Sequence, residues 1–486
     1  MPTIRRVCGE VEIQRAPMAA VERCRWSGIT LSAAVGAAII LLLAAPCSAA
    51  AAVPPALPAT VTPPPILDTG STAWMLVSTA LVMFMAPGLA LFYGGMVRKK
   101  NFLGTMMHSY TALAVVSVQW FVFGYMLVFG KDHWGIIGWQ PDKMMLWGVG
   151  PHHLVDVGGG HYIPETVFCM FQAMFAMITP AVIAGSVAER MKFRSYILFL
   201  LLWSTLVYDP LAHFMWGGGW LHQLGAVDFA GGTVVEIASG FSGLVMALYL
   251  GRRQGYPNQV LQPSSLAMAL TGAGILWFGW YGFNAGSAGA ATAVAGAAFL
   301  NTTIAAAVAA LAWNLAEWVH HRRPTTLGLA SGIVAGLVAI TPACGYVALW
   351  ASPIVGMLAG VICYLAVQMK IKIGYDDSLD PFGVHGVGGF LGMILTGLFA
   401  SAAVNSVSGL IEGNGRQFFI ECLAAVAAAA YALTGTAAVG VILQRTVGLR
   451  ISDVVETEGM DLGIHGENAW DTGAVPQPSE MAPAEA

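Results

Sequence analysis

Residues 73–101 read AWMLVSTALVMFMAPGLALFYGGMVRKKN, an apolar run that ends near three consecutive basic residues. About 20 apolar residues suffice for a helix to cross the roughly 30 Å hydrocarbon core of a bilayer. Basic residues beside such a helix are typical of its cytoplasmic end. The rest of the chain repeats the pattern, because 57% of its 486 residues are hydrophobic and 10% are charged. Soluble domains carry about 25% charged residues. The sequence therefore predicts an all-α polytopic membrane protein.

By this criterion the chain holds eleven apolar segments, and hence eleven predicted transmembrane helices. An odd number favours two pseudo-symmetric five-helix halves plus one extra helix, since internal repeats are common among transporters. The approximate limits of the segments are 73–95, 103–130, 164–187, 194–213, 229–251, 263–285, 290–319, 325–341, 346–368, 382–401 and 417–443.

The distribution of Lys and Arg predicts the orientation, because these residues gather in cytoplasmic loops. One set of alternate loops holds fourteen of them: Arg98, Lys99, Lys100, Arg190, Lys192, Arg194, Arg252, Arg253, Arg322, Arg323, Lys370, Lys372, Arg445 and Arg450. The other set holds three: Lys131, Lys143 and Arg416. We therefore expect the N-terminus outside the cell, the C-terminus in the cytoplasm, and the protein in the inner (plasma) membrane.

The N-terminal region resembles a secretory signal. Basic Arg23 and Arg25 precede an apolar stretch at 29–45 and a small-residue site at 47–50, which is the order of a signal peptide. An additional uncleaved helix is the alternative. The predicted organisation is a leader at 1–49, an extracytoplasmic Pro/Ala-rich segment at 50–71, a transmembrane domain at 72–443 and a loosely attached cytoplasmic tail at 444–486.

Two ionisable residues fall where a bilayer makes them costly. Glu236 lies eight residues after Asp228 in the fifth segment, about 12 Å deeper in a helix. His385 stands in the glycine-rich string GVHGVGG (383–389), and glycines allow close helix approach. Because intramembrane carboxylates and imidazoles often carry protons, we predict a proton relay. A buried structural pair is the alternative.

His385 lies only about 6 Å along its span when counted from Pro381. It reaches the middle of the membrane only if the irregular stretch 376–380 dips into the protein, which shielded backbone can do.

Aromatic residues recur at helical spacing. Phe171 and Phe175 are four residues apart, and Trp280, Phe283 and Ser287 follow at i, i+3 and i+7, which places each set on one helix face. Such stripes are usually packing or lipid-facing residues. Trp216, at the outer end of the fourth segment, is also compatible with an interfacial aromatic belt.

Other polar residues have structural interpretations. We expect Glu189, Arg190 and Glu317 to pair at the cytoplasmic interface, and His108 and His213 to be hydrogen-bonded packing residues. Scattered Cys169, Cys344, Cys363 and Cys422 lack ligand spacing. We therefore predict neither metal nor cofactor, apart from the less favoured possibility that the outer-loop histidines His152, His153 and His161 bind a metal. The net charge of −4 and the lack of a basic stripe indicate no nucleic-acid partner. A haem oxidoreductase would need facing histidine pairs, which the spans do not offer.

Several strings, taken together, resemble the Amt/Mep/Rh ammonium transporter family over residues 72–467. They are PGLALFYGGMVRKKN (87–101), MWGGGW (215–220), GAVDFAGGTVV (225–235), WYGFNAGSAG (280–289), TPACGYV (341–347) and DPFGVHGVGG (380–389). The resemblance is closest to bacterial Amt members. It implies eleven helices in two pseudo-symmetric halves, a pore within each subunit of a homotrimer, and no enzymatic activity.

The resemblance also implies roles for individual residues. Phe171, Phe175, Trp216 and Ser287 match the outer recognition site, and Asp228 matches an acidic residue that shapes its vestibule. Phe175 and Phe283 match the pair that closes the pore, and Trp280 matches a pore-lining tryptophan. Glu236 and His385 occupy the positions of the family's paired pore histidines. The first of these is glutamate here, which leaves ammonium transport as the expected function and the proton path open.

The expected activity is therefore transport of ammonium, ammonia and methylammonium across the lipid bilayer. A passive ammonia or carbon dioxide channel and an ammonium sensor, both of Rh-like type, are the alternatives. The tail string EGMDLGIHGENAW (458–470) is similar to tails on which a PII-type signalling protein acts. Gly463 stands where plant members carry a regulatory threonine, so we expect no phosphorylation switch there.

Overall fold

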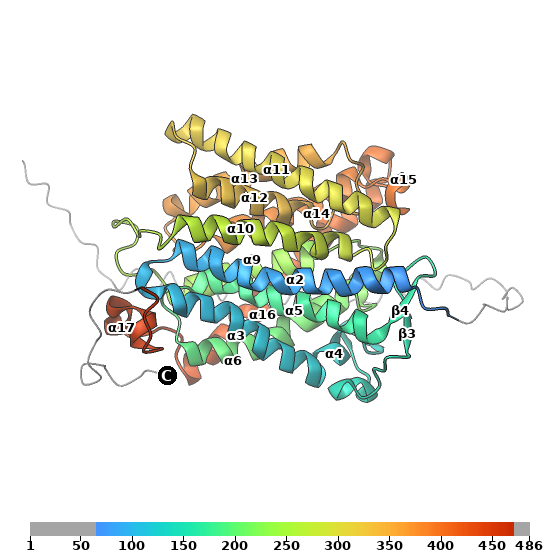
Figure 1. Ribbon diagram of the computed structural model, residues 1–486, viewed down its shortest axis with the longest axis horizontal. Coiled ribbons are helices and arrows are strands. Elements are labelled where there is room, and N and C mark those ends of the chain that lie inside the picture. The colour runs from blue at the N-terminus through green and yellow to red at the C-terminus, as the bar shows by residue number, and fades with distance from the viewer. Residues whose placement is uncertain (1–64, 471–486) are drawn as a thin grey trace, which may run out of the picture. The chain divides into compact units, whose positions relative to one another are not determined.

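The computed structural model describes residues 65–470. The predicted leader at 1–49, most of the segment at 50–71 and the end of the tail at 471–486 lie outside the described residues. Within them, long helices run side by side and short elements cluster at the two ends of the bundle (Figure 1).

Ten helical stretches of the described residues are long and apolar enough to cross a membrane. Their elements, separated here by stretch, are α2 (Thr69–Met96); η1 (Lys99–Asn101), α3 (Phe102–Gln119), η2 (Trp120–Gly124) and α4 (Tyr125–Phe129); α5 (Glu165–Val187); α6 (Phe193–Trp203), η4 (Ser204–Tyr208), α7 (Asp209–Met215) and α8 (Trp220–Leu224); η5 (Gly232–Ile237) and α9 (Ala238–Leu250); α10 (Leu266–Trp280) and η6 (Tyr281–Ala285); α11 (Ala293–His321); α13 (Ser352–Ile373); η7 (Phe382–Gly386) and α14 (Val387–Phe399); and α16 (Gly415–Thr446).

The eighth predicted segment forms α12 (Thr326–Ile340), which has 15 residues and rises about 22 Å. Each predicted segment therefore coincides with a helix, and the polytopic all-α prediction is confirmed. The number of helices that cross the full bilayer stays a prediction, because α12 is shorter than the others.

Five of the spanning stretches contain a π-helical turn, in which the backbone bonds to the fifth residue back instead of the fourth. These turns are η2, η4, η5, η6 and η7. In η5, for example, Glu236 N donates to Gly231 O at 3.0 Å. Turns of this kind often mark functional sites, and three of the five carry the predicted pore residues Glu236, Phe283 and His385.

The loop between α4 and α5 holds small elements that the all-α prediction did not include. They are η3 (Pro141–Leu146) and two antiparallel hairpins: β1 (Asp132–His133) with β2 (Ile137–Gly138), and β3 (Leu154–Asp156) with β4 (Tyr162–Pro164). Asp68 N donates to Tyr162 O at 2.8 Å. The second hairpin is therefore tied to the start of α2.

The tail is not loose along its described part, and the prediction was wrong on that point. After α15 (Ala402–Asn405), η8 (Leu410–Glu412) and α16, the chain forms α17 (Asp453–Glu458) and α18 (Met460–Gly463). The Asp461 carboxylate accepts hydrogen bonds from Leu103 N and Gly104 N at 3.0 and 2.8 Å. It therefore supplies acceptors for the otherwise unpaired first amides of α3, and the tail is held against the bundle.

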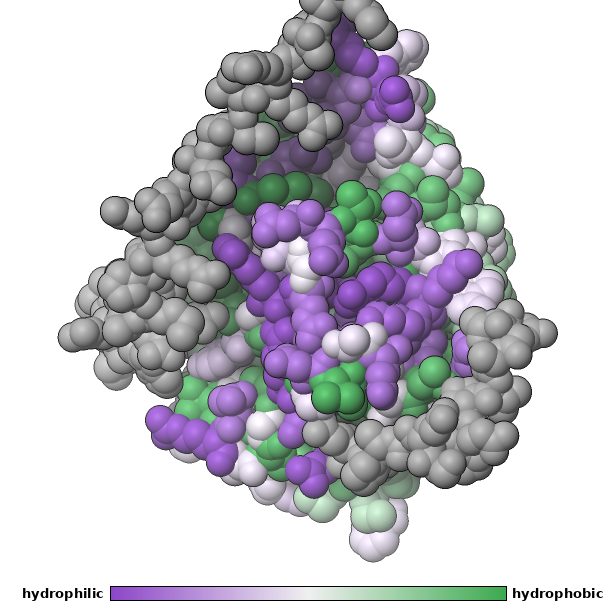
Figure 2. Space-filling model, turned by 90° about the vertical axis from the view of Figure 1, so that its left-hand side faces the viewer, coloured by the Kyte–Doolittle hydropathy of each residue, from purple (hydrophilic) through white to green (hydrophobic). Residues whose placement is uncertain are grey.

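Figure 2 shows the end of the bundle near which α17 lies, with hydrophilic residues gathered in the centre of that face. Basic residues from several of the predicted cytoplasmic loops meet there. Arg98 and Arg253 both pair with Glu189, and Arg450 pairs with Glu456. The alternation of loops that predicted the orientation therefore matches the arrangement of the helices.

Candidate functional site

Glu236 and His385 meet in the interior of the bundle. His385 Nδ1 lies 2.7 Å from Glu236 Oε2, and the two side chains are 5% and 1% exposed. The preceding stretch 376–379 is buried, so the backbone does dip inward before η7. The structure therefore brings together the two ionisable residues that the sequence singled out.

Glycines make this meeting possible. A Cβ added at Gly240 would lie 2.0 Å from Gly386 N, and one at Gly389 would lie 2.6 Å from Glu236 Cβ. Real Cβ atoms essentially never approach so closely. The helices that carry the pair therefore pack backbone to backbone, as glycine-rich membrane helices do.

The pair lines a narrow cavity of about 20 Å³, little more than one water molecule needs. Apart from Glu236 and His385, the cavity is lined by apolar and aromatic side chains: Met85, Leu89, Phe92, Ile178, Val182, Val235, Leu276, Trp280, Phe283 and Val334. Two ionisable side chains therefore face a space that offers them almost no other polar surface.

Phe283 also lines this cavity, and Phe175 packs against it. Their rings are stacked, with centroids 4.3 Å apart and planes 29° apart, and each side chain is 1% exposed. Trp280 packs on Phe283 at 5.2 Å, and its Nε1 donates to Thr341 Oγ1 at 2.9 Å. The predicted gate pair is thus in contact, and Trp280 holds a fixed position beneath it.

The predicted recognition residues surround the gate. Phe171 packs edge-on against Phe175 at 5.0 Å, and Trp216 does so at 5.8 Å. A Cβ at Gly286 would lie 3.0 Å from Phe171 Cε2, so the Phe171 ring lies against the turn that carries Ser287. Trp216 and Ser287 are half-buried. The hydroxyl of Ser287 donates to Phe283 O at 2.7 Å, which leaves its oxygen as an acceptor for another donor.

Asp228 acts on the backbone next to this group. Its carboxylate accepts hydrogen bonds from Gly231 N, Gly232 N and Thr233 N at 2.6–2.8 Å, and from the Thr233 hydroxyl. Its carbonyl oxygen accepts from Trp216 Nε1 at 3.1 Å. Asp228 therefore fixes the start of η5 and the orientation of Trp216, which agrees with a role in shaping the vestibule.

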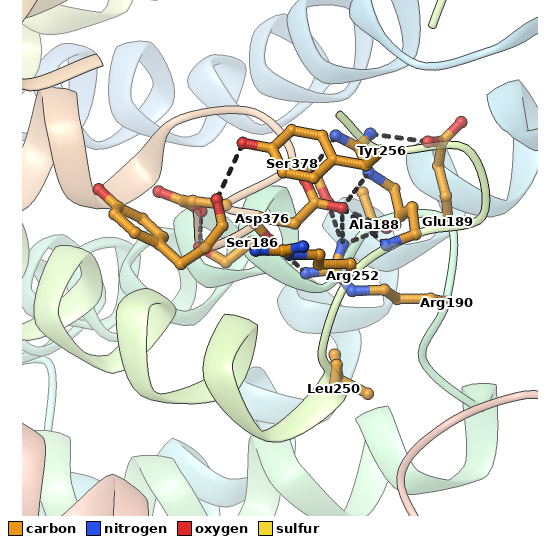
Figure 3. Close-up of polar contacts among 12 residues, drawn as sticks. Ser186, Ala188, Glu189, Arg190, Leu250, Arg252, Tyr256, Asp376 and Ser378 are labelled. Atoms are coloured by element: carbon orange, nitrogen blue, oxygen red, sulfur yellow. Dashed lines mark hydrogen bonds and ion pairs between the residues drawn. The ribbon is translucent and has the colours of Figure 1, made fainter. Parts of the chain in front are cut away.

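A buried ion cluster lies toward the predicted cytoplasmic end (Figure 3). Glu189 accepts from Arg98 Nε at 2.9 Å, Asn101 Nδ2 at 2.8 Å and Arg253 Nη1 at 2.7 Å. Arg253 also pairs with Asp376 at 2.8 Å. Burial raises the pKa of Glu189, but Arg253 and Arg98 lower it more strongly, to about 2. Glu189 is therefore ionised.

The expectation of interfacial pairing was half right for this cluster. Glu189 and Arg190 do pair or hydrogen-bond with polar partners, yet both are fully buried. Arg190 Nη2 donates to Asp376 O at 2.5 Å and its Nη1 bonds Ser378 Oγ. The position of Glu189 and Arg190 in the sequence, near basic loops, gave no sign that the loop 376–380 folds over these two residues.

Three other assignments have mixed outcomes. His213 is hydrogen-bonded as expected, to Val128 O and Asp132 Oδ1 at 2.6 and 2.8 Å. His108 is fully buried, but neither ring nitrogen has a partner in the described part of the chain, and it packs on Tyr196 instead. Glu317 accepts from Thr325 N at 2.9 Å and from the Thr325 hydroxyl at 3.0 Å, so it holds the residue that caps α12.

Asp209 is a polar residue that sequence reasoning missed. It lies within the fourth predicted segment, is fully buried, and accepts from Gln119 Nε2 at 2.6 Å. The sequence did indicate Asp209, because an ionisable residue inside a predicted span is a candidate functional residue by default. Apart from Trp280 and Phe283, the apolar residues of the cavity carried no such signal, since they are indistinguishable from ordinary core residues in the sequence.

The fold and site define a membrane-embedded protein with a narrow, mostly apolar cavity and an internal carboxylate–imidazole pair. Residues 73–470 match the model of the Ammonium Transporter Family. The chain belongs to this family, and it is an ammonium transporter.

Curated relatives agree over nearly their whole length. The chain is 49% identical to an ammonium transporter of Aquifex aeolicus over 406 residues, which cover 83% of this chain and 94% of that protein. It is 42% identical to the ammonium transporter Amt1 of Archaeoglobus fulgidus, covering 83% and 100% of the two chains.

Among solved structures, the crystal structure of Candida albicans Mep2 matches with a TM-score of 0.75 and 36% identity, covering 80% of this chain and 87% of that one. A structure described as a sensor Amt protein matches with the same TM-score, 25% identity and coverage of 81% and 97%.

Proposed function

We propose that the protein recruits ammonium at the outer aromatic site, deprotonates it at the Phe175–Phe283 gate and conducts ammonia through the apolar cavity. The proton is passed by Glu236 and His385. The observation that carries this proposal is that the Glu236–His385 pair faces the same narrow cavity as Phe283. The transported nitrogen compound leaves unchanged apart from its proton, so we expect no enzymatic conversion.

Recruitment rests on the chemistry of the half-buried outer residues. The ring of Trp216 offers a cation–π contact, and the Ser287 oxygen offers an acceptor for an N–H group. A desolvated cation–π contact is worth about 2 kcal/mol. The site therefore concentrates ammonium and equally accepts methylammonium, which keeps both the charge and N–H donors.

Passage beyond the gate favours the neutral molecule. The idealised cost of moving an ammonium-sized ion into low dielectric is of order 20 kcal/mol, far above what a few aromatic contacts return. Loss of a proton removes most of that cost. Potassium has no proton to lose, so the same dry cavity rejects it.

The proton has a chemically suitable carrier in the pair. When His385 donates from Nδ1 to the Glu236 carboxylate, its Nε2 carries the lone pair that accepts a proton. Because the two side chains are in contact, gain of a proton by one changes the charge that the other meets. Glutamate therefore replaces histidine at this position without loss of a proton-exchanging group.

The membrane arrangement and the partners extend the proposal. We expect a homotrimer in the inner membrane, with the N-terminus outside and the C-terminus in the cytoplasm. The tail that is held on α3 by Asp461 lies at the face where a PII-type protein would dock. At Gly463 a Cβ would lie 2.9 Å from Val455 Cγ1, so this position offers little room for a larger regulatory side chain.

The decisive experiment is a current measurement on proteoliposomes given ammonium, methylammonium or potassium, with protein-free liposomes as the control. We expect current with the first two cations and none with potassium. Equal currents for all three would contradict selection by deprotonation.

A passive channel or an ammonium sensor is the second candidate, and the likeness to the sensor Amt protein supports the sensor. Ammonia flux without net current would favour the passive channel. Ammonium binding without either flux or current would favour the sensor.

A further inference from the structure

The first turns of α16 carry two polar side chains that point into the protein. Gln417 and Glu421 are four residues apart and therefore share a helix face. Glu421 is fully buried and Gln417 is 9% exposed. Gln417 Nε2 donates to Glu421 Oε1 at 2.5 Å, so the two side chains form one polar unit within an otherwise apolar span.

This unit holds the loop between α8 and η5 at two points. Gln417 Nε2 donates to Gly225 O at 2.9 Å, and Val227 N donates to Glu421 Oε1 at 2.9 Å. Gly225 ends α8 in the left-handed conformation, with φ 92°. The loop therefore has its backbone fixed by α16 directly before Asp228.

The fixed loop in turn holds the outer recognition site. Asp228 follows Val227, and its carbonyl oxygen accepts from Trp216 Nε1 at 3.1 Å. Trp216 packs edge-on against the gate ring of Phe175. A continuous series of hydrogen bonds thus connects α16 to the aromatic face that meets the cation.

Packing alone does not account for a carboxylate at this position. Glu421 Oε2 is buried and has no hydrogen-bond partner among the described residues, and a buried polar atom without a partner costs free energy. A leucine or methionine would fill the space without that cost. The feature that an apolar residue would lack is the acceptor for Val227 N.

We propose that Glu421, together with Gln417, is a positioning residue of the ammonium recognition site. It sets the orientation of Trp216 through the backbone of Val227 and Asp228, and so determines affinity for ammonium and methylammonium. The inference rests on the proposed function of Trp216. It assigns Glu421 no contact with the substrate and no part in proton transfer.

The test compares Glu421→Leu, which removes the acceptor, with Glu421→Gln, which keeps one. We expect Glu421→Leu to raise the half-saturating ammonium concentration by up to about tenfold, since one buried hydrogen bond is worth about that factor at most. Maximal current should stay within about twofold, because the gate and the Glu236–His385 pair are untouched. Glu421→Gln should restore near-wild-type affinity. Glu412→Gln, an exposed carboxylate on the same side, is the matched control.

A double-mutant cycle separates positioning from a general structural effect. In a Trp216→Leu background the further change Glu421→Leu should leave affinity unaltered, because the residue through which it acts is gone. Additive effects, or a loss of maximal current with unchanged affinity, would overturn the inference. If the Glu421→Leu variant does not fold, the same double-mutant cycle is measured with Gln417→Met in its place. Absence of wild-type current would instead refute the proposed function itself.

Discussion

Two buried glutamates show two ways of keeping a carboxylate inside a membrane protein. Glu189, at the predicted cytoplasmic end, is bound by Arg98, Arg253 and Asn101. In the described part of the chain, the carboxylate of Glu236 is bound by His385 alone. Arginine is always charged, whereas histidine changes charge near neutral pH. The first arrangement therefore fixes a charge and stabilises structure, and the second is the pair to which our proposal assigns proton exchange.

The pH dependence of stability follows from the same contrast. The pKa of Glu189 in the folded protein, about 2, is lower than the ordinary value of about 4.3 for glutamate. Its contribution to stability is therefore present above the unfolded pKa and is lost as pH falls through the folded pKa. The Glu189 cluster should therefore not respond to pH changes between about 5 and 8.

The largest effect is expected from breaking the fixed cluster. Glu189→Ala removes the carboxylate that pairs with Arg98 and leaves Arg253 paired with Asp376, and removal of one partner of a buried ion pair costs about 3–5 kcal/mol. We expect a marked fall in the thermal unfolding midpoint in detergent, or loss of folded protein. Glu458→Ala, an exposed carboxylate on α17, is the control. An unchanged midpoint would show that the cluster is not structural.

The next effect is loss of transport when the exchangeable pair is broken. Glu236→Gln keeps the shape of the side chain and removes its proton-exchanging group. Since a positioned proton-transfer group contributes about 10²-fold or more to a rate, ammonium-driven current should fall at least that far. The unfolding midpoint and trimer formation should stay at wild-type values. Wild-type current with an unchanged pH profile would show that this carboxylate is only structural.

A loss of selectivity is expected when the narrow cavity that Glu236 and His385 line is opened to water. Phe283→Ala removes one ring of the stacked gate, and the apolar barrier that forces deprotonation weakens as water enters. Potassium leak or loss of transport is the expected result in the proteoliposome assay. Phe390→Ala, an aromatic residue that does not line the cavity, should leave selectivity intact. A faster channel with unchanged selectivity would argue against the barrier.

The smallest effect is expected from exchanging one proton carrier for another. Glu236→His retains a group that takes up and releases protons, so current should persist. Histidine and glutamate differ in their affinity for protons, so the pH profile of the current should shift. Current–pH curves for both proteins from pH 5 to 8 measure this shift. A profile that coincides with wild type would place the rate-determining proton step elsewhere.

The sequence predicted the helices and the central pair for identifiable reasons. Long apolar segments leave a strong signal, and Glu236 stands out because a carboxylate in such a segment is rare. The position of His385 in the interior depended on the chain dipping inward at 376–380, and residues 376–379 are buried.

What sequence reasoning missed has equally physical causes. Glu189 was expected at an interface, and its burial was missed. That burial depends on contacts between α5, α9 and the distant residue Asp376, which the sequence does not reveal. The attached tail was missed because Asp461 gains its partners on α3, far away in the chain. The π turns leave no trace in hydrophobic spacing, which does not report a single extra residue in a helix.

Those π turns have a consequence for how the protein can change. A π turn holds one residue more than the α-helical turn it replaces, so losing that residue can leave a continuous helix. Each residue of an α-helix advances by about 100°. A one-codon deletion at 232–237, at the start of the span, would therefore leave α9 intact and change the position of the outer loop that precedes it. The number of residues in this turn, and not only the identity of its side chains, thus determines how the outer loop meets the helix.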